Sequence, residues 1–225
     1  MKHTDREYEA ELQRLRERLL LMGARIEEMI VRAMRAFSES DVELAREIIA
    51  SDEEVDRLEM TIDEQCVKIL AKRQPVASDL RFLTTTLKIV TDLERVGDLA
   101  VNICERVVEL ENQPALAGRS ALESMGSAAH GMMHDALDAF IQRNVELAQA
   151  VMERDSAVDA AYAQTFPALM ALMIKSSDNV YPAQRLQSIG KYLERIADHA
   201  TNVAEMVVFM VRGEDPRHSH GAVTH

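Results

Sequence analysis

Residues 94–105 read ERVGDLAVNICE, and residues 194–205 read ERIADHATNVAE. The two stretches lie 100 positions apart, and Glu, Arg, Asp, Asn and Glu recur at matching places in both. Upstream, the tetrapeptide VELA at residues 42–45 recurs at residues 145–148, with an offset of 103. The chain therefore consists of two copies of one unit, which meet near residues 112–114.

Each unit is long enough for three amphipathic helices. Between Leu80 and Val108, apolar residues recur three and four positions apart, which is the spacing of one helix face. Ser40 and Glu43 fit a capping box at the start of a second helix, and Pro167 predicts a kink or break in the fifth. Polar and Pro-containing segments predict helix ends at residues 38–41, 74–75, 112–114, 142–144 and 176–179.

We therefore expect an all-α fold made of a tandem, pseudo-symmetric repeat of two antiparallel three-helix bundles. The first bundle would occupy residues 1–113 and the second residues 114–213. Residues 214–225, which include His218, His220 and His225, are expected to form a disordered polar tail.

Composition narrows the possible functions. The 225 residues include 38 acidic and 26 basic side chains, for a net charge of −12, whereas a nucleic-acid-binding protein needs a positive field. No uninterrupted apolar run approaches the ~18 residues of a membrane span, and the N-terminus has no apolar signal region. We expect a soluble, cytoplasmic protein without membrane insertion, in which Cys66 and Cys104 are buried, reduced thiols.

Four pairs of acidic residues carry the main functional signal. Two acids four positions apart share one helix face, but 38 acids in 225 residues give roughly six such pairs by chance. Here, however, each pair recurs in the second unit, on the equivalent helix and beside its apolar seam. Carboxylates at a seam are costly unless something compensates their charge. The candidate metal ligands are Asp52, Asp56, Glu94 and Asp98 in the first unit, and Asp155, Asp159, Glu194 and Asp198 in the second.

Other polar residues near these pairs give weaker signals. Arg95 and Arg195 are expected to be surface charges or partners of a nearby acid, and Asn102 and Asn202 either support the metal ligands or are polar seam residues. His199 is expected to act locally, because it points about 100° away from Asp198 on the helix. The neighbouring pair His130 and His134 is expected to be a solvated helix edge.

Three functions remain open at this point: a metal-binding regulator, a carboxylate-bridged metalloenzyme and a purely structural helical scaffold. The sequence has no Gly-rich phosphate loop after a strand, no GxSxG and no Glu-x-x-His pair, so an enzyme is disfavoured. Oxygen ligands alone do not distinguish Fe, Mn, Zn and Mg.

Three longer motifs together resemble the PhoU family, the accessory proteins of the bacterial phosphate-specific transport system. They are RQPVASDLR at residues 73–81, LERVGD at residues 93–98 and LERIADHATN at residues 193–202. The resemblance covers nearly the whole chain and includes the two-copy layout. The family often has Gly-Asp-His in both copies, whereas this chain has Leu99 after Asp98 and Ala197 before Asp198.

The resemblance implies a non-enzymatic protein with multinuclear metal clusters of Fe, Mn, Zn or Mg, held by the eight carboxylates named above. It also implies negative regulation of phosphate uptake and of the phosphate-starvation response. The implied partners are the transporter's ATPase subunit and a sensor histidine kinase, and the implied assembly is a homodimer.

Overall fold

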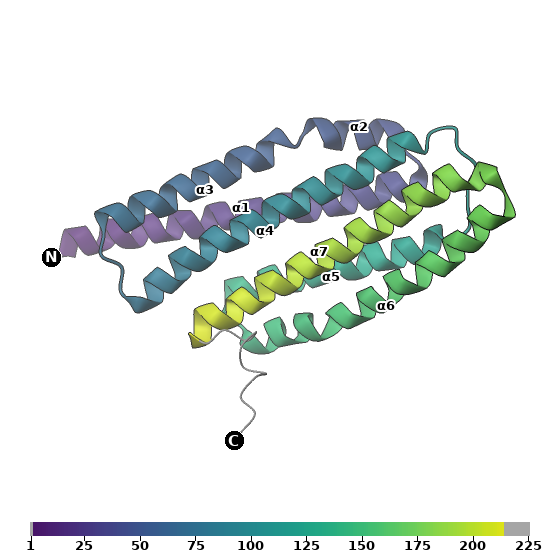
Figure 1. Cartoon of the computed structure of the whole chain (residues 1–225). Helices are drawn as coiled ribbons and strands as arrows, with labels where there is room; N and C mark the ends of the chain where they lie inside the picture. Colours follow the sequence, from purple (N-terminus) through teal and green to yellow (C-terminus); the bar gives the residue numbers. More distant parts are fainter. Residues whose placement is uncertain (1, 214–225) are drawn as a thin grey trace, which may run out of the picture.

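The chain folds into two helical bundles lying side by side (Figure 1). The computed structural model describes residues 2–213, and no strand occurs among them. The predicted tail, with its three histidines, lies outside the described residues. The all-α double bundle predicted from the repeat is confirmed. The helices are α1 (Lys2–Glu39), α2 (Val42–Ala50), α3 (Glu53–Lys72), α4 (Ala77–Glu109), α5 (Arg119–Gln142), α6 (Val145–Lys175) and α7 (Val180–Arg212), with a short 3₁₀ helix at Ser177–Asn179.

The last helices of the two units, α4 and α7, lie against each other along the middle of the molecule (Figure 1). The first bundle comprises α1 to α4 and the second α5 to α7, and α1 also packs against α5. Leu93 and Ile103 of α4 and Leu193 and Val203 of α7 are fully buried. One continuous hydrophobic core therefore runs through both bundles.

The second helix of each unit begins with the same local geometry. Asp41 precedes α2 and Asn144 precedes α6, 103 positions later, and each side chain accepts a hydrogen bond from the backbone N–H three residues on. The capping box predicted for Ser40 is wrong. Ser40 has a positive φ of 55°, as does its equivalent Arg143 at 52°, because these residues end the preceding helix. Asp41 is therefore the residue placed to cap α2.

Two helix boundaries differ from the prediction. The second helix of the first unit is interrupted at Ser51, whose backbone N–H and hydroxyl both bond to the carbonyl of Ile48, so α2 and α3 are separate helices. Conversely, of the kink or break predicted at Pro167, the break does not occur, because α6 continues through it. Proline removes one backbone hydrogen bond, but Thr165 and Leu169 on either side are buried in the core and hold the helix in place.

Candidate functional site

The four predicted ligands of the first unit come together where α3 begins beside the middle of α4. Burial raises the pKa of Asp52, and the charges of Asp56 and of Asp98 across the helix pair raise it further. Burial likewise raises the pKa of Glu94, assisted by Asp98, while the adjacent Arg95 opposes the rise. The N-terminus of α3 offsets part of this repulsion, because its helix dipole favours negative charge there.

The second unit repeats this arrangement on α6 and α7. Burial raises the pKa of Asp155, and so does its neighbour Asp159, whereas the facing Thr201 lowers it. Burial also raises the pKa of Asp198, with contributions from Glu194 on its own helix and from Asp155 and Asp159 on α6. All eight predicted residues therefore belong to two clusters of four, which we call the first and the second acidic cluster.

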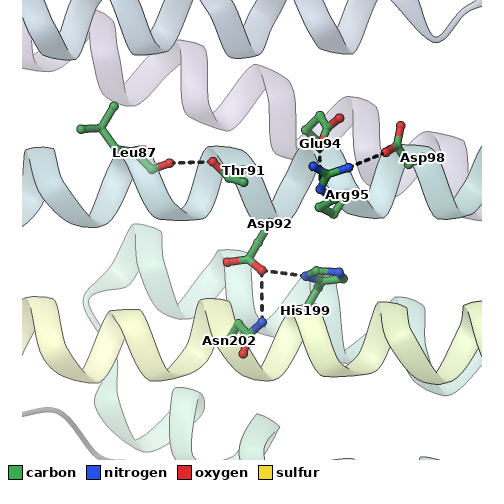
Figure 2. A network of polar contacts seen from close by, with 8 residues as sticks. All are labelled: Leu87, Thr91, Asp92, Glu94, Arg95, Asp98, His199 and Asn202. Atoms are coloured by element: carbon green, nitrogen blue, oxygen red, sulfur yellow. Dashed lines mark hydrogen bonds and ion pairs between the residues drawn. The ribbon is translucent and has the colours of Figure 1, made fainter.

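Each cluster contains one largely buried glutamate that forms an ion pair with a basic side chain. The side chains of Glu94 and Glu194 are 16% and 15% exposed, respectively. Arg95 Nε lies 3.4 Å from Glu94 Oε2, and its Nη1 donates to Asp98 Oδ2 at 3.2 Å (Figure 2), which confirms Arg95 as a partner of neighbouring acids. In the second cluster, Lys191 forms the ion pair with Glu194.

Across the described residues, no three Asp, Glu, His or Cys side chains converge as they would around a single bound ion. The carboxylates of each cluster thus share one electrostatic field without forming a closed cage. A cation would draw them inward, and their hard oxygen atoms fit Mg²⁺, Mn²⁺ and other hard ions. Oxygen donors of this kind suit a hard metal ion, and binding one would require the side chains to leave the positions that they have here.

The clusters are unequal in a way that the repeat alone did not predict. Burial raises the pKa of Glu59, and Asp63, Asp56 and, on α4, Asp98 raise it further, so Glu59 adjoins the first cluster. Glu59 and Asp63 have the same i, i+4 spacing as the predicted ligands, which was the available signal. Their equivalents in the second unit are Tyr162 and Phe166, and the nitrogen of Lys191 lies 5.5 Å from the centre of the Tyr162 ring.

These raised pKa values predict that the metal-free chain loses stability as the pH rises. Asp52, Glu94, Asp155 and Asp198 all have a pKa above the ordinary 3.8 of Asp or 4.5 of Glu. The folded state therefore binds more protons than the unfolded state between the ordinary and the raised values, and the free energy of unfolding falls through that window. Urea titrations in chelator from pH 4 to 8 should show this decline.

A variant carrying amides at these four positions serves as the control for that titration. It should lose the decline that the four carboxyls cause, because an amide does not titrate, and its advantage over the original chain should grow with pH. Parallel stability curves for the two proteins at every pH would contradict the prediction.

A separate polar contact joins the two bundles (Figure 2). Asp92 on α4 points away from the first acidic cluster, and its Oδ1 lies 2.6 Å from His199 Nδ1 and accepts a hydrogen bond from Asn202 Nδ2 at 3.1 Å. The prediction that His199 acts locally is therefore wrong, because it contacts the other bundle. Asn202 is a polar seam residue, one of the two roles predicted for it. The equivalents of these three residues are Tyr192, Leu99 and Asn102, so the repeat offered no signal for the contact.

Asp92→Ala is expected to lower the free energy of unfolding by about 1 kcal/mol, because it leaves two partly buried polar partners unsatisfied. Urea denaturation measures the change. A double-mutant cycle with Asn202→Ala should give a positive coupling energy, since both substitutions remove the same bond. Strict additivity of the two changes would show that Asp92 and Asn202 contribute independently.

The remaining histidine prediction is partly changed by the structure. His130 and His134 stack along α5 with ring centres 6.4 Å apart, and His134 is half exposed, as expected for a helix edge. However, His134 Nδ1 also lies 3.1 Å from Glu27 Oε2 of α1, which raises the pKa of His134 and adds another polar contact between the bundles. Cys66 and Cys104 are buried free thiols, as predicted, and burial raises the pKa of each to about 12.

The comparisons with known proteins assign the chain to a family. Residues 19–107 and 122–207 each match the PhoU domain model. The chain belongs to the PhoU family. A PhoU homolog from Pseudomonas putida is 37% identical over 96% of this chain and 85% of its own length, and the phosphate-specific transport system accessory protein PhoU of Escherichia coli K12 is 35% identical over 98% and 91%.

Solved structures of PhoU proteins confirm the fold of this chain. The crystal structure of PhoU from Pseudomonas aeruginosa superposes with a TM-score of 0.89 at 36% identity, covering 92% of this chain and all of that one. The phosphate transport system regulatory protein PhoU from Streptococcus pneumoniae gives a TM-score of 0.84 at 30% identity, covering 92% and 98%. The resemblance identified from the three motifs is therefore confirmed.

Proposed function

We propose that this chain is a metal-binding accessory protein that negatively regulates phosphate uptake and phosphate-starvation signalling. The observation that carries the proposal is the pair of acidic clusters at equivalent places in a two-unit PhoU fold. Relatives that match nearly the whole chain are named accessory proteins of the phosphate-specific transport system, which supports a non-enzymatic role in the cytoplasm.

Asp52, Asp56, Glu94 and Asp98 would hold one metal cluster, of Fe, Mn, Zn or Mg. The other cluster would be held by Asp155, Asp159, Glu194 and Asp198. A bound cation would supply positive charge against the mutual repulsion of the carboxylates. The chain's own part is to hold α3 against α4, and α6 against α7, so that each helix pair presents its carboxylates together. A partner could then recognise the stiffened helix pair.

The partners in this proposal are the transporter's ATPase subunit and a sensor histidine kinase, contacted by a homodimer. The test is a pull-down of the two purified partners by the full chain, with Mn²⁺ or with chelator. The proposal expects at least one partner to be retained, and more of it with metal. The variant Glu146→Gln, which removes an exposed acid outside both clusters, should retain the partners and respond to metal like the original chain. Retention of neither partner in either condition would overturn the adaptor function.

A further inference from the structure

An apolar groove runs along the seam between α5 and α6. Its volume is about 660 Å³, and Arg154 is the one charged residue among those that line it in the described part of the chain. Along α5 and its N-cap, the lining extends from Gly118 to Met132, which is about 21 Å, or four turns. Small side chains form much of its walls, namely Ala121, Ser124, Ser127, Ala128 and Gly131 on α5, and Ala157, Ala161 and Ala168 on α6.

The corresponding seam of the first bundle, between α1 and α3, is closed by polar bridges. Arg18 donates from Nη1 to Gln65 Oε1 at 2.7 Å, and Arg25 Nη2 lies 3.1 Å from Glu54 Oε1. A pocket in this seam measures about 240 Å³ and is lined mostly by charged and polar side chains, including Arg18 and Gln65. The first bundle thus fills this seam with its own side chains.

The offset of 103 shows why the second seam stays open. Each of these four bridging residues has an alanine as its equivalent in the second bundle. Arg18 and Gln65 correspond to Ala121 and Ala168, and Arg25 and Glu54 correspond to Ala128 and Ala157. Both bridges are therefore absent at once, and the space that they occupy in the first bundle is the groove of the second.

The helix that forms one wall of the groove is also unusually apolar for its position. By length and composition, α6 is the one described helix that could cross a membrane. Only 17% of its most apolar 18-residue segment is buried within the protein, so most of that segment is exposed. Length and composition alone are weak evidence for insertion, because helices of water-soluble bundles pass the same test. An apolar stretch of helix normally packs against a covering neighbour. Part of α6 is left without one in the described chain.

We propose that the groove binds one amphipathic helix of a partner protein, about four turns long, with large apolar residues on one face and basic residues at its edges. The groove's length and nearly uncharged lining call for such a face, and alanine walls leave room for Leu, Met or Phe. The net charge of −12 favours basic edges, and Glu123 and Glu153 are sequence neighbours of lining residues.

A second copy of the chain fits less well, because it carries the same net charge. In a symmetric dimer the two concave grooves would also face each other and leave unfilled space between them. A lipid surface is flat and anionic and fills a concave groove on an acidic protein poorly. The inference rests on the proposed adaptor function only in assuming a protein partner, and it is independent of the acidic clusters.

The test refills the groove with the first bundle's own bridges. Ala128→Arg with Ala157→Glu leaves the net charge unchanged, and Ala121→Arg with Ala168→Gln is a second, independent refill. The matched control is Gln149→Glu with Ala150→Arg, at exposed positions of α6 outside the lining. Circular dichroism verifies the helix content of every variant.

The probe is a fluorescent 15-residue peptide with leucines on one helix face and lysines on the other. A version in which serines replace the leucines measures binding by charge alone. We expect the leucine peptide to bind the full chain more tightly than the serine peptide, and each refill to weaken it about tenfold or more, with the control unchanged. A photo-crosslinker on the peptide should label residues of α5 and α6 that line the groove.

Equal affinity for the refilled and original chains, or crosslinks elsewhere, would overturn the inference. So would a dimer in sedimentation that either refill dissociates, since the occupant would be a second copy. Vesicle flotation that either refill abolishes would assign the groove to lipid. In the partner pull-downs, equal retention by refilled and original chains overturns the inference and leaves the proposed function standing. If the peptide binds in the groove but neither partner is retained, the inference stands and the proposed function is overturned.

Discussion

Asp98→Asn is expected to weaken Mn²⁺ binding by the first acidic cluster about 100-fold or more and to leave the second cluster's binding unchanged. Substituting a residue that merely supports a metal ligand lowers metal affinity ~10–100-fold. Asp98 is itself a proposed ligand, and its charge also acts on Asp52, Glu59 and Glu94. Isothermal titration calorimetry on metal-free protein measures both clusters in one experiment.

The matched variant Asp198→Asn should have the mirror effect on the second cluster. The first cluster is expected to bind more tightly, because Glu59 adds a carboxylate there, whereas each cluster has one competing basic side chain, Arg95 or Lys191. Asp98→Asn should therefore remove the tighter of two binding phases. If both single variants bind Mn²⁺ like the original chain, the acidic clusters are solvated surfaces and the scaffold alternative is correct.

Phe37→Ala is expected to lower the free energy of unfolding by about 3–5 kcal/mol, the largest stability change we predict. The Phe37 ring is fully buried at the end of α1, and the guanidinium of Arg119, from the second bundle, lies 4.7 Å from its centre. Arg119 also donates a hydrogen bond to the Phe37 carbonyl. Removing the ring therefore leaves a cavity at a point where the bundles meet. Urea denaturation measures the loss.

Two further variants test whether the loss of stability comes from the cavity left by the Phe37 ring. Phe37→Leu should recover part of the loss, because leucine fills some of the cavity. Leu21→Ala, at a side chain of the same helix that is 51% exposed, should change stability by no more than about 0.5 kcal/mol. A Phe37→Ala effect as small as that of Leu21→Ala would show that the surrounding core collapses to fill the space.

The fold was predictable because its signals are local and duplicated. Apolar spacing places the faces of α4 and α7, and breaker residues near positions 74–75 and 176–179 agree with the observed helix ends. The errors arose where alternatives were locally equivalent. Ser40 and Asp41 are both capping residues, and only the backbone at Ser40, with its positive φ, leaves the cap to Asp41. Pro167 stays inside a helix because the core on either side holds it.

The candidate site was predictable to the extent that the repeat duplicates it. Asp52 and Glu94 recur as Asp155 and Glu194, and the structure groups each with its expected neighbours. Glu59 was omitted because its equivalent, Tyr162, is not acidic, although its spacing fits the same pattern. Occupation of either cluster by a metal stays a prediction.

By itself, the sequence determined the helices, their duplication and the faces that carry the acids, because periodicity and spacing act within one helix. Only the tertiary structure decided that Asp92 meets His199, 107 residues away, and that the seam between α5 and α6 stays open. Both depend on which helices become neighbours and on how closely they approach. Packing of the whole core sets those distances, and no stretch of sequence encodes them alone.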